Sequence, residues 1–118
     1  MALRKSEGFD SLRLHSEDRD ELIWLAGYLE GEGSFLRPMP STPNMPVIQV
    51  HTTDSDVAAH VGRLFGTKIH RIELSKKNTR WKDAWLVVVR GNPAVDLMLA
   101  LKPYMGMRRQ QQIERAID

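Results

Sequence analysis

An eleven-residue stretch constrains this chain more than any other: Leu25-Ala-Gly-Tyr-Leu-Glu-Gly-Glu-Gly-Ser-Phe35. Its pattern predicts the last turns of a helix that runs directly into a strand, with Glu32 at the junction. Gly27 and Gly31 stand one turn apart, and a glycine inside a helix costs roughly 1 kcal/mol relative to alanine. Two such glycines predict that a second backbone approaches this helix closely. The stretch is too short, and its flanks too charged, for a membrane span.

This stretch resembles the motif of the LAGLIDADG homing endonucleases. Leu25, Ala26, Gly27, Leu29 and Gly33 stand where that motif expects them, and glutamates at positions 30 and 32 replace its two aspartates. The resemblance implies a DNA-cutting enzyme in which two such helices pack together and present two carboxylates at their ends. A buried helix that contains glycine by chance is the alternative.

The bulk composition sets limits on the class of protein. A chain of 118 residues predicts one domain, which we place at residues 16–118 after a tail at 1–15. The absence of cysteine excludes a disulfide framework and a cysteine-ligated zinc site. The N-terminus has no apolar signal segment, so we expect the protein in the cytoplasm, on the nucleoid when bound to DNA. A net charge of +2 leaves nucleic-acid binding open.

The order of predicted elements is helix, two strands, helix, two strands, then two helices. The predicted ranges are 17–31, 34–40, 47–51, 54 or 55 to 65, 68–74, 84–90, 92–101 and 107–117. Ile48 and Val50 should face the core, Gly66 should end the second helix, and Asn92 should cap the third ahead of Pro93. Ile69 and Ile72 do not alternate, which suggests a bulge.

This order matches the αββαββα layout of the LAGLIDADG family. The resemblance implies an α+β fold in which a four-stranded antiparallel sheet carries helices on one face and DNA on the other. A single motif in a short chain implies a homodimer, which should prefer a near-palindromic site. We expect the dimer interface to include residues of the motif helix, namely Leu22, Ala26, Gly27, Glu30 and Gly31.

Phosphodiester hydrolysis requires charge neutralisation and an activated water, and a divalent metal supplies both. Following the resemblance, we assign Glu32 as the metal ligand, assisted by the Gly31 carbonyl oxygen, with one acid from each subunit. We expect Mg²⁺, with Mn²⁺ as a substitute and Ca²⁺ binding without cleavage. Two copies of Glu32 would repel each other, and a bound cation relieves that repulsion. Glu30 is expected to end the helix or to pair with a cation.

Two further catalytic assignments follow from the resemblance. Arg108 or Arg109 would lie near the scissile phosphate and stabilise negative charge as the bond breaks. The alternative is that both arginines only decorate the start of the last helix. Thr52 would order the attacking water, although threonine is also a common strand residue.

DNA recognition requires donors and acceptors on the sheet face that the helices leave free. Gln49 and His51 alternate away from the core, and the further candidates are Arg37, His70 and Arg71. The loop between the last two strands is basic and should contact phosphate groups, with a solvated hairpin tip as the alternative reading. Its cations are Lys76, Lys77, Arg80 and Lys82.

The sequence is also compatible with functions other than DNA cleavage. The same fold could serve a non-cleaving DNA-binding regulator or an intron RNA maturase in place of an endonuclease. A further alternative is a small interaction protein that dimerises through the glycine-faced helix. No phosphate-binding loop, HxxxH zinc pair or nucleophile elbow occurs in the sequence, so no small-molecule cofactor is expected.

Overall fold

A computed structural model of the chain describes residues 16–37 and 45–117. The predicted tail at 1–15 and the prolines at 38, 40 and 43 lie outside these ranges. The helices are α1 (Ser16–Glu32), α2 (Ser55–Phe65), α3 (Asn92–Leu101) and α4 (Met107–Ile117), with short 3₁₀ turns η1 (Leu74–Lys76) and η2 (Lys102–Tyr104). The strands are β1 (Gly33–Leu36), β2 (Val47–Thr52), β3 (Ile69–Ile72) and β4 (Ala84–Arg90). The predicted order of elements is therefore confirmed. No helix in the described ranges is long and apolar enough to cross a membrane.

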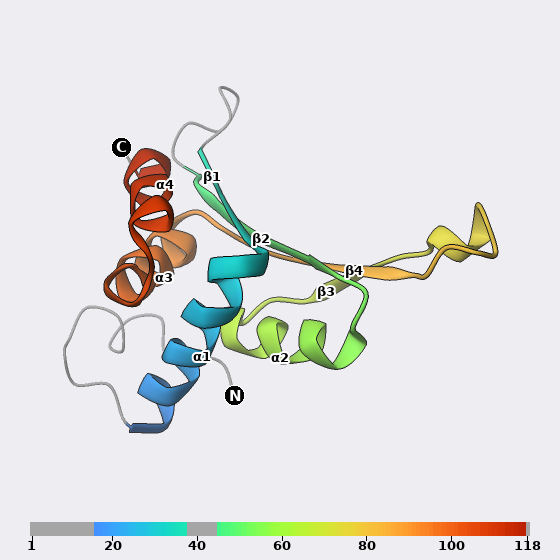
Figure 1. Ribbon diagram of the computed structural model, residues 1–118, viewed down its shortest axis with the longest axis horizontal. Helices are drawn as coiled ribbons and strands as arrows, with labels where there is room; N and C mark the ends of the chain where they lie inside the picture. Colours follow the sequence, from blue (N-terminus) through green and yellow to red (C-terminus); the bar gives the residue numbers. More distant parts are fainter. Residues whose placement is uncertain (1–15, 38–44, 118) are drawn as a thin grey trace.

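The strands form one antiparallel sheet in the order β1-β2-β4-β3. Ile48 and Val50 of β2 are fully buried, while Gln49 and His51 between and beyond them remain accessible. This alternation arises because successive strand residues point to opposite faces. The helices gather on one side of the sheet (Figure 1), which confirms the predicted α+β architecture.

The core lies between the sheet and the helices. Leu22, Leu25 and Leu29 of α1 are at most 1% exposed, because they recur on one helical face that packs against the rest of the chain. They meet the inward residues of the sheet and the apolar faces of the other helices: Phe35, Ile48, Val50, Val61, Phe65, Val87, Leu97, Met98, Leu101 and Ile113. A single chain thus builds its own core around the motif helix.

The ends of two helices test the capping predictions. Gly66 has a φ of 69° and ends α2 in the left-handed conformation, as predicted. The cap predicted for the third helix is wrong by one residue. Gly91 occupies the N-cap position of α3 and Asn92 is already helical, with Pro93 in the first turn.

The predicted bulge in the third strand is also wrong. β3 pairs with β4 without interruption from Ile69↔Val87 to Ile72↔Ala84, so Ile69 and Ile72 point to opposite faces. β3 is shorter than predicted and ends at Ile72, shortly before η1. Together with β4 it forms an arm that projects beyond the helices (Figure 1).

Candidate functional site

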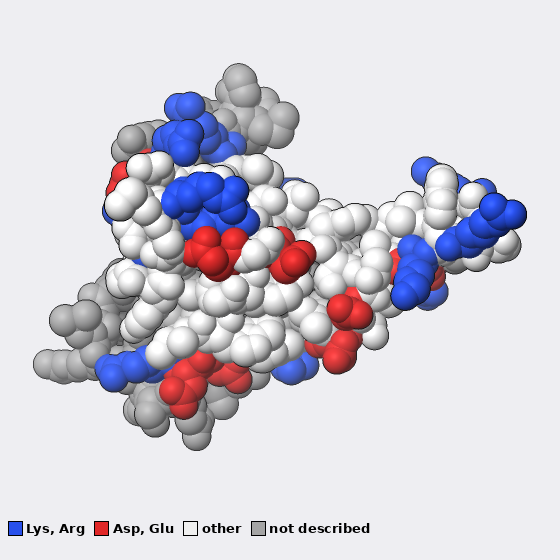
Figure 2. All heavy atoms as spheres, viewed as in Figure 1, with Lys and Arg blue, Asp and Glu red and all other residues white. Residues whose placement is uncertain are grey.

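The C-terminal end of α1 concentrates negative charge. Glu32 is the last residue of the helix and is exposed, as is Gly31 before it. The last turn of α1 contains no basic residue, and the final carbonyl groups of a helix carry partial negative charge. In Figure 2, drawn in the same view as Figure 1, red acidic side chains lie directly beside a blue basic patch near the centre left of the molecule. This end of α1 is therefore suited to a cation.

Two residues that the sequence reading missed lie beside Glu32. Burial raises the pKa of Tyr28 above its ordinary value of 10.0; the Thr52 side chain opposes this, and the carboxylates of Glu32 and Asp54 add to the increase. Tyr28 stands one helical turn before Glu32, which is the signal that could have identified it. The Thr52 hydroxyl also accepts a hydrogen bond from the Asp54 amide at 3.1 Å. The structure thus brings Thr52, Tyr28 and Asp54 to the acidic end of α1.

Glu30 is held within its own chain. Its Oε1 accepts a hydrogen bond from the Gly106 amide at 2.6 Å, and its Oε2 lies 3.9 Å from Arg109 Nε. The carboxylate therefore points to the start of α4, which agrees with the expectation that Glu30 pairs with a cation. The Glu30 side chain is still 40% exposed, and its place in a dimer interface stays a prediction.

The two neighbouring arginines point in different directions. Arg109 is only 8% exposed and donates from Nε to the Glu30 carbonyl oxygen at 3.0 Å and from Nη1 to Gln112 Oε1 at 2.8 Å. Arg108 is exposed, and no ion pair involves it within the described ranges. Of the two alternatives for the phosphate-stabilising cation, Arg108 is the one whose guanidinium group is open to a ligand.

One face of α1 is apolar and open to solvent. Ile23 and Trp24 are 45% and 38% exposed, and Gly27 and Gly31 continue the same stripe. A Cβ added to either glycine would meet no atom within 4 Å. Leu22 and Ala26 are each 1% exposed inside the monomer core, so their predicted place in the dimer interface is wrong. They lie on the opposite side of the helix from the open stripe.

The sheet face opposite the helices carries most of the predicted base-reading residues. In the register, both His51 and His70 pair with Leu86, and Gln49 pairs with Val88, so these three polar side chains share the free face. Arg71 pairs with Trp85 and therefore points to the opposite face. It is bound there to Asp83 through two hydrogen bonds. The prediction of Arg71 as a base-reading residue is thus corrected.

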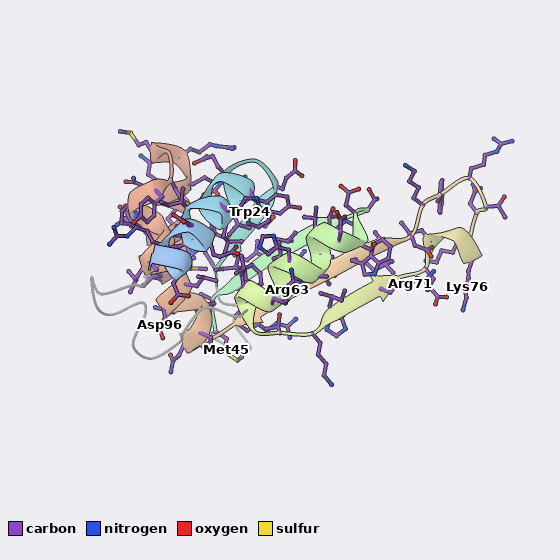
Figure 3. All side chains as sticks on the ribbon, turned by 90° about the horizontal axis from the view of Figure 1, so that it is seen from below. Trp24, Met45, Arg63, Arg71, Lys76 and Asp96 are labelled. Atoms are coloured by element: carbon purple, nitrogen blue, oxygen red, sulfur yellow. The ribbon has the colours of Figure 1, made fainter. Side chains whose placement is uncertain are left out.

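The arm carries the predicted phosphate-binding loop at its end. Figure 3 shows Arg71 partway along the arm and Lys76 near the tip. Lys76 pairs with Glu73, which raises the pKa of the lysine. Lys77, Arg80 and Lys82 are exposed and form no ion pair within the described ranges. Asn78 shapes the tip by accepting hydrogen bonds from the Arg80 and Trp81 amides.

The acidic end of α1 can supply part of a metal site. The residues that the structure describes contain no group of three or more histidine, cysteine or carboxylate side chains placed to hold a metal ion. Mg²⁺ keeps several water ligands and is bound through one or two carboxylates. An exposed Glu32 next to the Gly31 carbonyl could therefore supply one carboxylate and one carbonyl oxygen to such a site.

Comparison with known proteins shows which solved structures are similar to this chain. No protein-family model matches the chain, and no curated protein matches it. Among solved structures, the homing endonuclease I-CvuI in complex with the I-CreI target and 2 mM Mg is similar, with 16% identity and a TM-score of 0.63. That match covers 83% of this chain and 64% of I-CvuI, so the chain spans somewhat less than two thirds of it. I-CvuI with its own target and 2 mM Ca matches with 15% identity and a TM-score of 0.62, over 86% of this chain and 71% of that one.

The two matches cover 83% and 86% of this chain. The similarity confirms, at the level of the fold, the resemblance that the stretch from Leu25 to Phe35 predicts. This chain has the fold of the LAGLIDADG homing endonucleases.

Proposed function

We propose that this protein is a metal-dependent DNA endonuclease that acts as a homodimer and makes a staggered double-strand cut in a long, near-palindromic site. The observation that carries the proposal is the position of Glu32. This exposed carboxylate ends the same helix whose stripe leaves Ile23 and Trp24 partly exposed and its two glycines in open space. Packing two chains through this stripe would bring two copies of Glu32 together.

The glycines of the stripe support the homodimer. Within its own chain, neither Gly27 nor Gly31 needs to be glycine, because an added Cβ would enter open space. Two helical glycines cost roughly 2 kcal/mol in total relative to alanine. Close approach of a second α1 accounts for this cost, with Ile23 and Trp24 adding apolar area to the contact.

The residues around Glu32 suggest a division of roles. Glu32 and the Gly31 carbonyl would hold the metal, which neutralises charge on the phosphate and activates water when bound. Tyr28, whose pKa is raised, stays protonated at neutral pH and can orient a water together with Thr52. Arg108 would stabilise negative charge on the phosphate, since arginine keeps its proton at neutral pH.

A cleavage selection tests the proposal. The purified chain would be incubated with a random-sequence duplex library and Mg²⁺, in parallel with Glu32→Gln and with the wild type in Ca²⁺. Glu114→Gln is the matched control, because it also removes one exposed carboxylate but at the α4 surface, where Glu114 pairs with Lys102.

We expect cut products that share a near-palindromic sequence from the wild type and from Glu114→Gln, and none from Glu32→Gln or with Ca²⁺. Bound but uncut DNA, enriched equally by all the proteins, would contradict the proposal and identify a DNA-binding regulator. Absence of any salt-dependent affinity for duplex DNA would instead favour an interaction protein.

A further inference from the structure

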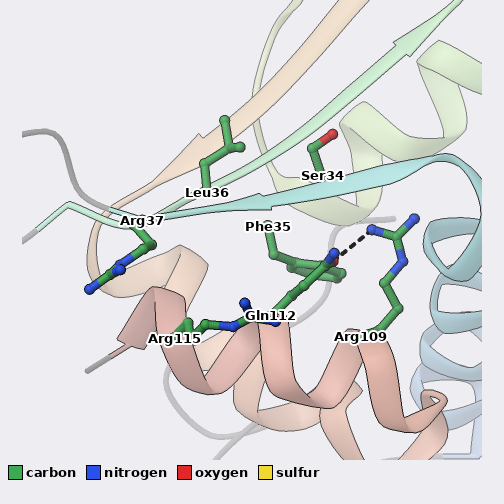
Figure 4. Close-up of a pocket in the computed structure, with 7 residues that line it drawn as sticks. All are labelled: Ser34, Phe35, Leu36, Arg37, Arg109, Gln112 and Arg115. Atoms are coloured by element: carbon green, nitrogen blue, oxygen red, sulfur yellow. Dashed lines mark hydrogen bonds between the residues drawn. The ribbon is translucent and has the colours of Figure 1, made fainter.

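A groove between β1 and α4 gathers three arginines. Figure 4 shows Arg37 at the end of β1 and Arg109 and Arg115 on α4, with Ser34 and Gln112 also lining the groove. Its volume is about 270 Å³. None of its lining residues in the described part of the chain is acidic, so three arginines border this open groove without a carboxylate among the described walls.

The innermost arginine is fixed before any ligand binds. Arg109 is held by the Glu30 carbonyl oxygen and by Gln112, and its guanidinium carbon lies 6.0 Å from the centre of the Phe35 ring. The nearest carboxylate oxygen in an ion pair with it is Glu30 Oε2, at 3.9 Å. A cation whose side chain is already ordered loses little entropy when it binds an anion.

The two outer arginines are more exposed than Arg109. Arg37 and Arg115 are both exposed, and neither forms an ion pair within the described ranges. Arg115 donates from Nε to the Gln111 carbonyl oxygen of its own helix, at 3.3 Å. Guanidinium groups match the geometry of phosphate oxygens in bidentate contacts, so this set of side chains is chemically suited to phosphodiester groups.

We infer that the β1–α4 groove binds the sugar-phosphate backbone of one DNA strand. The contact lies where the DNA strand passes beyond the β1 edge of the protein's sheet. Ser34 connects the groove to the free face, because it pairs with Gln49, which lies on that face. The groove also begins two residues after Glu32. This inference rests on the proposed function, and it gives Arg37 and Arg115 a phosphate-binding role away from the base edges and the scissile bond.

A salt titration of DNA binding tests the inference. Fluorescence anisotropy would measure the affinity of a labelled mixed-sequence duplex, in Ca²⁺, for the wild type, Arg37→Gln, Arg115→Gln and the double variant. Arg63→Gln is the matched control, because Arg63 is an exposed arginine on α2, outside the groove (Figure 3). Each lost phosphate contact should reduce the slope of log K against log salt by about 0.9.

We expect each groove variant to lower the slope by about 0.9 and the double variant by about 1.8, with the thermal unfolding temperature unchanged. Arg63→Gln should keep the wild-type slope. Wild-type slopes in all groove variants, together with intact cleavage by the wild type, would overturn this inference and leave the proposed function standing. Loss of poly-glutamate binding in these variants, with an unchanged DNA slope, would assign the groove to an acidic protein segment. A wild type that binds no duplex DNA would overturn both proposals.

Discussion

The guanidinium Nε of Arg109 donates a hydrogen bond to the backbone carbonyl oxygen of Glu30 at 3.0 Å, across 79 positions of sequence. The contact joins the last turn of α1 to the first turn of α4. It satisfies a carbonyl that the helix itself leaves without a partner, because the last four carbonyls of a helix have none. The acidic end of α1 is thereby fixed relative to the groove beside β1.

Replacing Arg109 with alanine should destabilise the fold, whereas the same change at Arg108 should not. Arg109→Ala leaves the Glu30 carbonyl and Gln112 without this donor in a largely buried place, at a cost of about 1–3 kcal/mol in the free energy of unfolding. Arg108→Ala removes an exposed side chain and should change that free energy by less than about 0.5 kcal/mol. Urea unfolding measures both. Equal effects of the two changes would contradict this assignment.

Gly27→Leu should strengthen the helix and prevent association. Leucine has a helix propensity better than that of glycine by roughly 0.8 kcal/mol, and open space surrounds position 27 in the single chain. The added side chain would, however, hold a second α1 away. Sedimentation velocity should show a dimer for the wild type and for Gln111→Leu, an exposed control on α4, and a monomer for Gly27→Leu. A Gly27→Leu dimer as stable as the wild type would place the interface elsewhere.

Tyr28 should titrate late in the alkaline range. Its pKa is raised above 10.0, mainly by burial, so the folded state holds this proton more tightly than the unfolded state does. The contribution to stability is fully present below pH 10 and is lost as the pH rises through the folded pKa. The chain has two tyrosines, so the difference in tyrosinate absorbance between the wild type and Tyr28→Phe isolates Tyr28. Titration of this difference at or below pH 10 would contradict the burial that we describe.

Much of the fold could be predicted because it depends on local patterns. The alternation of Ile48 and Val50 with Gln49 identifies a strand and its buried face, and Gly66 ends a helix through its own backbone freedom. The motif also placed Glu32 at the junction of α1 and β1. These features need no knowledge of distant residues.

The errors concern relationships between segments. The spacing of Ile69 and Ile72 predicts a bulge only if both side chains must face the core. The sequence does not show that β3 extends beyond the core, where an apolar residue can lie on either face of the sheet. The interface prediction for Leu22 and Ala26 is wrong because helical spacing identifies an apolar face without showing what covers it. Arg109 is buried against the end of α1 and Arg108 is exposed. This difference depends on where α1 ends in space, which the sequence around the two arginines does not show.

Base recognition should depend on Gln49 and not on Arg71. Gln49 lies on the free face of the sheet, where its amide can form a bidentate contact with adenine, whereas Arg71 points to the opposite face and is bound to Asp83. Gln49→Ala should therefore relax the preference at one base pair of each half-site, with a loss of about 1–3 kcal/mol of discrimination. The selected sites of Arg71→Ala should keep the wild-type consensus. Sequencing of DNA bound in Ca²⁺ measures both preferences. A consensus altered by Arg71→Ala and unchanged by Gln49→Ala would contradict this assignment of base reading to the free face of the sheet.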